Sequence, residues 1–177
     1  MKKTRLITVV FVVAAMILNV CILSAQDDKS KRPSPPAQAK GTIGNAAITI
    51  DYSQPAVKGR EIGVQLAPYG KVWRTGANEA TTFEVSADVK VEGKTLKAGK
   101  YGLFTIPGEN EWVIIFNTVP DQWGSRNYDK SKDALRVSVK PGKTSDSTER
   151  FTISVENSGQ VVMKWGNHEV NFSVSGS

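Results

Sequence analysis

The sequence of 177 residues is nearly free of the side chains that most metal and nucleophile sites use, with one cysteine, Cys21, and one histidine, His168. Cys21 lies in an N-terminal segment that we expect to be removed, which would leave no disulfide and no thiol nucleophile. A lone histidine cannot build a multi-histidine zinc site, and no Gly-x-Ser-x-Gly motif surrounds a serine. We therefore expect no cofactor, no metal, and a turn or strand-surface position for His168.

Other chemical signatures are missing as well. No glycine-rich phosphate-binding loop precedes a helical segment, and no glycosidase motif is present. Asp121, Asp129 and Asp133 lack the acid-Gly-acid order and the final glutamate of an EF-hand, so we expect no calcium site. Without residues 1–25 the chain has 20 basic and 17 acidic side chains, a net charge of +3. This mild and scattered charge argues against a nucleic-acid partner.

Residues 1–25 have the pattern of a secretory signal peptide. A basic start is followed by the apolar residues 6–23, and Ala25 supplies the small residue that precedes cleavage. We predict cleavage before Gln26, export to the periplasm or out of the cell, and no membrane span afterwards. Two alternatives stay open. One is an uncleaved anchor, because 18 apolar-rich residues approach the ~20 that span a bilayer; the other is a lipoprotein attached at Cys21, which the large residue before it disfavours.

The sequence after the cleavage point divides into a polar segment and one domain. Residues 26–41 are polar, carry three prolines and show no apolar periodicity, so we predict a flexible linker there. Residues 42–177 are predicted to form a single domain, because the mature length suits one hydrophobic core.

Apolar residues alternate with polar ones over most of this domain, which is the pattern of β-strands. About nine such runs predict an all-β fold, an antiparallel β-sandwich, with a small β-barrel as the alternative. Residues 101–106 and 111–117 are apolar on both faces and are predicted to form a central hairpin. The last three runs are predicted to form an antiparallel meander with a tight turn at Gly166-Asn167; they are residues 151–155, 161–165 and 170–174.

Two long polar segments, 53–82 and 118–134, do not fit strands, and loops of this length in compact domains are often functional. The stretches APYGKVWRTGANEATTFEVS (67–86) and LKAGKYGLFTIPGENEWVIIFN (96–117) resemble a bacterial family called domain of unknown function 2911, or DUF2911. The resemblance covers about residues 33–174. It implies an exported protein of a family common in Bacteroidetes, and it supplies no substrate and no catalytic residue.

The densest group of polar side chains is predicted to be the binding site. It offers an aromatic face, a guanidinium, a carboxylate, an amide and hydroxyls, which suit a sugar or another polar ligand. The alternative is that Arg74 pairs with Glu79 and Asn78 caps a turn, so that the group only holds its own loop. The candidate residues are Trp73, Arg74, Thr75, Asn78, Glu79 and Thr82.

A second group, in the later loop, is predicted to assist the first. Of the four tryptophans, Trp112 and Trp165 fall on alternating strand positions and are predicted to be core. The other two, Trp73 and Trp123, are expected to contact the ligand. The candidate residues of this second group are Trp123, Arg126, Tyr128 and Asp129.

These observations favour a noncatalytic cell-envelope module that binds a polar ligand, a glycan or another envelope protein. The alternative is a periplasmic hydrolase in which Glu79 acts as acid or base and Arg74 stabilises negative charge. That chemistry requires both residues to converge in a cleft with a second acid, for which Asp129 and Glu61 are the candidates. A structural envelope protein without a small-molecule site is the third alternative.

Overall fold

The computed structural model describes residues 28–177. The predicted signal peptide, residues 1–25, and its cleavage point lie outside the described residues. The chain divides into two compact units, residues 1–32 and 33–177. In the described part of the first unit, Asp28 caps the single-turn 3-10 helix η1 (Lys29–Lys31) by accepting a hydrogen bond from the backbone N–H of Ser30 at 3.2 Å.

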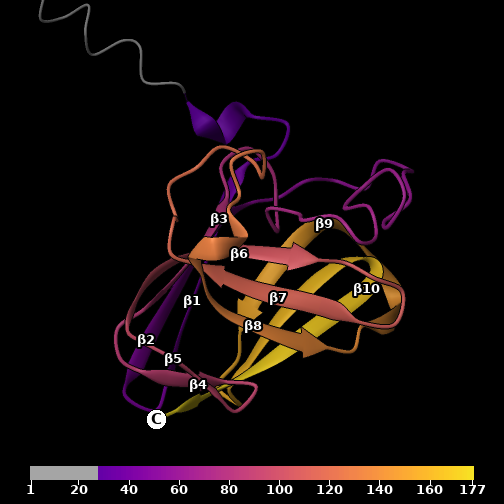
Figure 1. The fold of residues 1–177 in the computed structure, drawn as a ribbon. Coiled ribbons are helices and arrows are strands. Elements are labelled where there is room, and N and C mark those ends of the chain that lie inside the picture. Colours follow the sequence, from indigo (N-terminus) through magenta and orange to yellow (C-terminus); the bar gives the residue numbers. More distant parts are fainter. Residues whose placement is uncertain (1–27) are drawn as a thin grey trace, which may run out of the picture. The chain divides into compact units, whose positions relative to one another are not determined.

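The second unit contains ten strands in two antiparallel sheets (Figure 1). The larger sheet has the order β1-β2-β3-β6-β7-β8, and the smaller sheet has the order β5-β4-β10-β9. A second 3-10 helix, η2 (Lys130–Lys132), precedes β8. The strands are β1 (Pro36–Ile43), β2 (Ala46–Ser53), β3 (Thr81–Val85), β4 (Val89–Val91), β5 (Lys94–Leu96), β6 (Gly99–Ile106), β7 (Trp112–Asn117), β8 (Asp133–Val139), β9 (Gly142–Val155) and β10 (Gln160–Gly176).

The two sheets enclose one hydrophobic core, and the predicted β-sandwich is confirmed. The alternation of side chains along each strand is the cause, because every second residue faces the opposite sheet. In β2, Ile48 and Ile50 are buried on either side of the less buried Thr49. In β3, Phe83 and Val85 are buried around an exposed glutamate. The sheets do not close on each other, so the barrel alternative is wrong.

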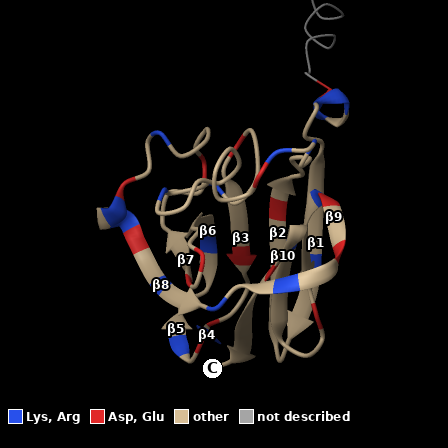
Figure 2. Cartoon of the chain, turned by 90° about the vertical axis from the view of Figure 1, so that its right-hand side faces the viewer, with Lys and Arg blue, Asp and Glu red and all other residues tan. Residues whose placement is uncertain are grey.

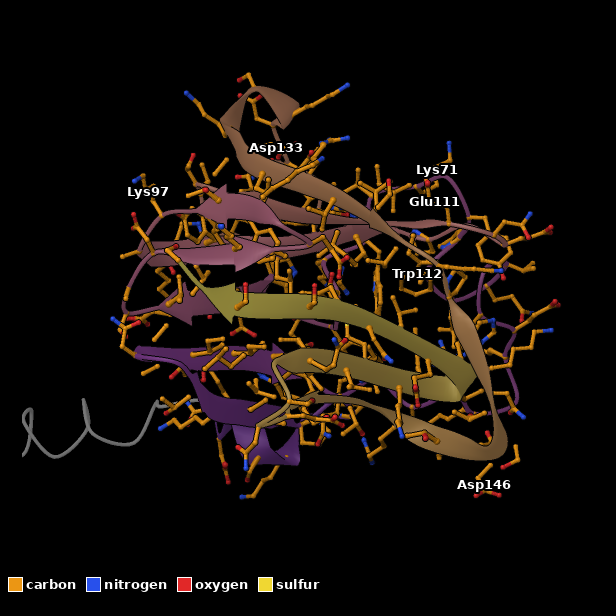
Figure 3. All side chains as sticks on the ribbon, turned by 90° about the horizontal axis from the view of Figure 1, so that it is seen from below. Lys71, Lys97, Glu111, Trp112, Asp133 and Asp146 are labelled. Carbon is orange, nitrogen blue, oxygen red and sulfur yellow. The ribbon has the colours of Figure 1, made fainter. Side chains whose placement is uncertain are left out.

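Four large aromatic side chains pack together within this core. Trp73 stacks on Trp165 with ring centroids 5.2 Å apart, and it meets Phe151 and Trp112 edge-on at 5.1 and 6.3 Å. Trp112 and Trp165 are each 4 % exposed, which confirms that both belong to the core. Figure 3 shows Trp112 directed into the molecule, whereas the charged Lys97 lies at its periphery.

The predicted central hairpin is confirmed, because β6 and β7 pair with each other and lie between β3 and β8. The outer face of this hairpin is apolar as well. Phe104 and Ile115 are fully buried there and form a smaller cluster with Ala80 from one long loop. Tyr128 from the other long loop packs against the same cluster. The long loops therefore cover the outer face of the central strands.

We predicted a flexible linker over residues 26–41, and this prediction is wrong for its C-terminal part, which forms a strand. Pro36–Ile43 form β1 and pair along their whole length with β2. The close packing of this strand requires glycine at position 41, since a Cβ on Gly41 would lie 2.4 Å from Cγ1 of Val155. Alanine and glycine give no apolar alternation, and the sequence pattern therefore concealed the strand.

Of the predicted meander at the end of the chain, the first antiparallel pair, residues 151–155 with 161–165, is confirmed, and the second turn is wrong. Residues from the last two predicted runs form the single strand β10, which pairs with β9 and with β4. Gly166 does not turn the chain; it lies at a β-bulge with φ +54°, where the register against β9 shifts. Bulges and tight turns both use glycine at positive φ, so Gly166-Asn167 did not distinguish them.

Charged residues of both signs occur together on the strands and loops. Figure 2 shows basic and acidic positions mixed over the visible face instead of gathered by sign. Some form ion pairs, such as Lys97 with Asp88 at 2.8 Å and Lys164 with Glu169 at 3.0 Å. In the part of the chain that is described, no helix has the length and apolar character needed to cross a bilayer.

Candidate functional site

The predicted ligand-contacting residue Trp73 is partly buried and packs against the aromatic part of the core. Its indole Nε1–H donates to the carbonyl oxygen of Gly76 at 3.0 Å. Its backbone pairs with Thr105 of β6 through hydrogen bonds of 2.8 and 2.9 Å. Together with the stacking on Trp165, these contacts engage the ring and its donor within the protein. Trp73 thereby holds its loop on the sandwich, and its contact with a ligand stays a prediction.

Thr75 and Asn78 also direct their polar groups inward. Thr75 is fully buried, and its carbonyl oxygen accepts the hydroxyl of Thr81 at 2.7 Å. Asn78 has φ +61°, and its amide donates to the carbonyl oxygen of Ser34 at 3.0 Å and to Oγ of Ser53 at 3.2 Å. These contacts agree with the alternative in which the polar group holds its own loop.

The other members of the first group lie in half-buried or buried positions. Thr82 is 9 % exposed. Burial lowers the pKa of the Arg74 guanidinium, and its Nε has no hydrogen-bond partner among the described residues. Nη1 of Arg74 would lie 3.2 Å from a Cβ on Gly124. Glu79 forms an isolated antiparallel bridge with Trp123. The Arg74–Glu79 pair stays a prediction.

In the second predicted group, the hydroxyl of Tyr128 is hydrogen-bonded to side chains of β8. Its hydroxyl donates to Oδ2 of Asp133 at 2.7 Å and accepts from the guanidinium of Arg136. Burial, aided by the hydrogen bond to Asp133, raises the pKa of Tyr128 to about 12. Tyr128 thereby fastens the later loop to β8.

The remaining residues of this group lie at the surface. Asp129 caps η2, because its carboxylate accepts the backbone N–H of Ser131 at 2.8 Å. The side chain of Ser131, and next its backbone N–H, lower the pKa of this carboxyl by hydrogen bonding. Trp123 is 62 % exposed, and Arg126 is exposed as well. The structure thus spreads the predicted candidates between core, loop framework and surface.

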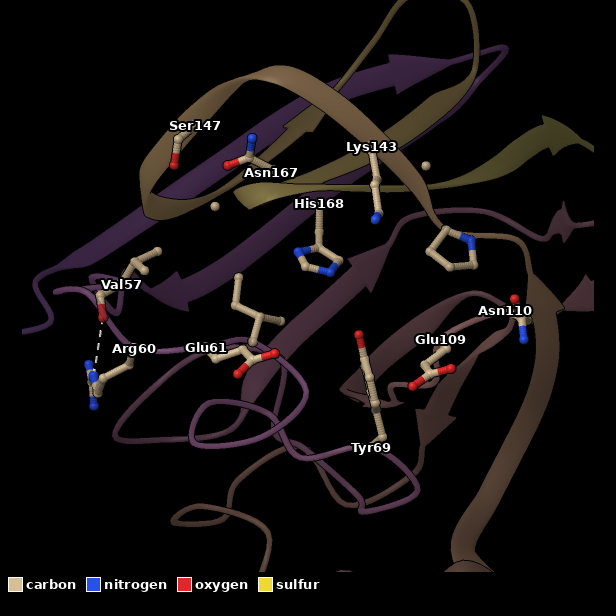
Figure 4. Close-up of a pocket in the computed structure, with 14 residues that line it drawn as sticks. Val57, Arg60, Glu61, Tyr69, Glu109, Asn110, Lys143, Ser147, Asn167 and His168 are labelled. Carbon is tan, nitrogen blue, oxygen red and sulfur yellow. Dashed lines mark hydrogen bonds between the residues drawn. The ribbon is translucent and has the colours of Figure 1, made fainter.

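A pocket of about 640 Å³ lies between the loop of residues 57–69, the turn after β6, and the β9–β10 hairpin. Its volume is within the range of small-molecule sites. Figure 4 shows side chains from these segments directed toward one space. None of the predicted ligand-binding residues, all of which are described, lines this pocket, whereas Glu61, a possible second acid of the hydrolase alternative, does. The side chains that give it chemical character are Glu61, Tyr69, Glu109, Asn110, Lys143, Asn167 and His168.

One wall of the pocket is built by the β9–β10 hairpin. His168 and Lys143 are directly opposed in the two strands, so both side chains lie on the same face. Gly166 has no side chain, which lets the facing loop approach closely: a Cβ at this position would lie 3.0 Å from Cδ1 of Ile62. The glycine therefore positions the strand wall against the loop wall.

The loop of residues 57–69 builds the facing wall and is held by hydrogen bonds of its own. The backbone N–H of Glu61 donates to Oε1 of Gln65 at 2.8 Å, and the carbonyl oxygen of Glu61 accepts the N–H of Gln65 at 3.1 Å. Nη2 of Arg60 donates to the carbonyl oxygen of Ala56 at 2.8 Å. These bonds use backbone groups and Arg60, and the carboxylate of Glu61 faces the pocket (Figure 4).

Tyr69 is fixed in this wall by Gly63. A Cβ on Gly63 would lie 2.3 to 2.6 Å from three atoms of the Tyr69 ring, so the ring lies directly against the glycine. Gly63 also has φ +91°, a conformation that other residues rarely adopt. The backbone N–H of Tyr69 donates to the carbonyl oxygen of Gly63 at 2.9 Å. The hydroxyl points toward the middle of the pocket (Figure 4).

The two walls differ in charge. Burial raises the pKa of the Tyr69 phenol, and the carboxylates of Glu109 and Glu61 raise it further. Burial lowers the pKa of His168, and Lys143 lowers it further. Tyr69 and His168 are therefore neutral at pH 7, and each keeps an N–H or O–H to donate. They lie between a negative loop wall and a positive strand wall.

This pocket could not be predicted from the sequence, because its residues come from separate segments of the chain. His168 was expected at a turn or on a strand surface; it lies in β10 and lines the pocket. One local signal was present: Gly166 interrupts an alternating run beside the only histidine. No local pattern connects that position to Glu61 or Glu109, which only the tertiary fold brings near it.

Comparisons with known proteins give a family and no activity. A family model described as "Protein of unknown function (DUF2911)" matches residues 34–174, which confirms the resemblance noted in the sequence. No curated protein and no solved structure matches the chain. Within residues 28–177, no group of three His, Asp or Glu side chains is placed to hold a metal ion.

Proposed function

The chain belongs to the DUF2911 family, and from the pocket we propose that it is a noncatalytic cell-envelope module that binds a glycan. The observation that carries this proposal is the pocket of about 640 Å³, in which an aromatic ring, carboxylates, amides and a neutral imidazole converge. The envelope location rests on the signal-peptide pattern of residues 1–25.

The residue types in the pocket suit a sugar. Sugar hydroxyls both donate and accept hydrogen bonds, and the carboxylates of Glu61 and Glu109 accept while the amides of Asn110 and Asn167 do both. Tyr69 adds an aromatic ring, which packs against the C–H groups of a sugar, and a hydroxyl. The internal hydrogen bonds of the loop hold these groups in place before binding, which lowers the entropic cost of association.

A hydrolase is less well supported than a binding module. The hydrolase considered from the sequence relied on Arg74 and Glu79 converging with a second acid in a cleft. Neither residue lines the described pocket, and Arg74 is half-buried beside Gly124. The proposal therefore assigns binding without turnover.

Thermal unfolding of the purified chain in the presence of small sugars tests the proposal. A sugar that binds the folded state at 100 times its Kd adds about 2.7 kcal/mol to the free energy of unfolding and raises Tm. We expect the double variant Tyr69→Ala, Asn167→Ala to lose this increase while remaining folded. The control Trp123→Ala, at an exposed aromatic outside the pocket, should keep it. If only the control lost the increase in Tm, the sugar would bind at the loop of Trp123 that was predicted from the sequence, and the pocket assignment would be wrong.

A further inference from the structure

The charges of the pocket are separated between its two walls. The negative charges of Glu109 and Glu61 both add to the raised pKa of Tyr69, so both carboxylates lie near the Tyr69 hydroxyl on the loop wall. On the other wall, Lys143 of β9 lies directly opposite His168 of β10, and its positive charge contributes to the lowered pKa of His168. Figure 4 shows the Lys143 ammonium on the strand side and the two carboxylates on the side of Tyr69.

These charges are not neutralised by the protein. Among the ion pairs of residues 28–177, none includes Glu61, Glu109 or Lys143. The acid beside His168 in β10, Glu169, is already paired with Lys164 at 3.0 Å. Lys143 therefore has no carboxylate partner on the neighbouring strand.

The other cation that borders the pocket is also engaged elsewhere. Arg60 donates from Nη2 and Nε to the carbonyl oxygens of Ala56 and Val57, at 2.8 and 3.2 Å. It fixes the loop and does not pair with the neighbouring Glu61. Two carboxylates on one wall and one ammonium on the other are left to face a bound molecule.

We infer that the pocket binds an amino sugar that carries both a protonated amine and a carboxylate, with the amine between Glu61 and Glu109 and the carboxylate at Lys143. This inference rests on the proposed glycan-binding function and specifies its ligand class. A charged group gains more from these walls than a hydroxyl does, because hydrogen bonds between ionised groups are stronger than those of neutral ones. Neutral His168 and the Asn167 amide supply further donors to the carboxylate.

Titration calorimetry at pH 7 with four sugars tests the inference, because these sugars carry the ammonium, the carboxylate, both groups or neither. N-acetylglucosamine has neither charge, glucosamine has only the ammonium, N-acetylmuramic acid has only the carboxylate, and muramic acid has both. We expect muramic acid to bind at least about tenfold more tightly than either singly charged sugar, and the uncharged sugar to bind most weakly. Alanylalanine, a zwitterion that is not a sugar, should bind far more weakly than muramic acid.

Charge-removing variants assign each group to its wall. The double variant Glu61→Gln, Glu109→Gln should weaken glucosamine and muramic acid about tenfold and leave N-acetylmuramic acid unchanged. Lys143→Met should weaken the two carboxylate sugars and leave glucosamine unchanged. The matched controls Glu84→Gln and Lys100→Met, at exposed positions outside the pocket, should change neither.

Each other outcome contradicts a defined part of the argument. Equal binding of the four sugars at the pocket would overturn the charge assignment and leave glycan binding in place. Equal binding of alanylalanine and muramic acid would overturn the assignment to a sugar. No binding of any sugar would overturn the proposed function and this inference together.

Discussion

The segment 73–82 and the loop 57–69 are both polar and lie close together in the sequence, but the structure uses them in different ways. In the first, Trp73, Thr75 and Asn78 direct their polar groups to backbone and side-chain partners within the sandwich. In the second, hydrogen bonds within the loop hold it, and the side chains of Glu61 and Tyr69 face a pocket. Where the hydrogen-bond partners lie, more than polar composition, distinguishes a framework loop from a binding loop.

The largest expected effect is on the framework side of this comparison. Trp73→Ala removes a ring that contacts Trp112, Phe151 and Trp165, and we expect a loss of about 3 to 5 kcal/mol in the free energy of unfolding. Urea unfolding followed by circular dichroism measures it. Tyr69→Ala, at a half-buried ring, should cost less than half as much. A small loss for Trp73→Ala with abolished sugar binding would reverse the roles of the two segments.

Gly63 provides a test of the binding side. In Gly63→Ala the new methyl group would lie 2.3 Å from the Tyr69 ring, so the ring must move and the pocket wall must change. We expect affinity for muramic acid, measured by calorimetry, to fall at least about tenfold, or 1.4 kcal/mol.

Gly59→Ala is the matched control for this variant. Gly59 belongs to the same loop and has φ +68°, but no atom lies within 4 Å of a Cβ placed there. Both variants therefore carry the backbone strain of alanine at positive φ, on the order of 1–2 kcal/mol, and only Gly63→Ala displaces Tyr69. Equal affinity in the two variants would show that the position of the Tyr69 ring does not matter for binding.

Tyr128 tests whether the later loop belongs with the framework. Tyr128→Phe removes the hydrogen bond to Asp133 and leaves that largely buried carboxylate with one fewer donor, which should cost about 1–2 kcal/mol of stability. Muramic acid affinity should not change, because Tyr128 does not line the pocket. Chemical denaturation and calorimetry on the same variant check both statements; a lost affinity with unchanged stability would contradict them.

The sequence predicted the architecture better than the site, for physical reasons. Alternation in β2 and β3, and apolar runs on both faces of β6 and β7, reflect local geometry, and these strands and the sandwich follow from them. β1 was missed because packing against Val155 leaves no room for a side chain at Gly41, and the alanines of the strand give no strong apolar alternation. Lys143 and His168 meet only because β9 and β10 pair in one register, which depends on a bulge. Long-range register of this kind leaves no local pattern.

The smallest expected effect concerns the acid side of the pH range. Burial and Lys143 lower the pKa of His168 below its ordinary value of 6.5, so the unfolded chain binds a proton that the folded chain resists. The contribution to stability is complete above about pH 6.5 and is lost as the pH falls through that value toward the lower pKa of the folded state. The charged groups around His168 are Lys143 on β9 and Glu61 on the loop, with Tyr69 beside it (Figure 4).

His168→Gln should remove this part of the acid dependence. Unfolding of the variant and the parent chain by urea at pH 5, 6, 7 and 8 measures the difference, which should grow below pH 6.5 and stay constant above it. Lys143→Met should reduce the same difference, because it removes the positive charge that opposes protonation of His168. A parent chain that gains stability from pH 7 to pH 5 relative to His168→Gln would mean that His168 is protonated in the folded pocket, and the positive wall would then consist of two cations.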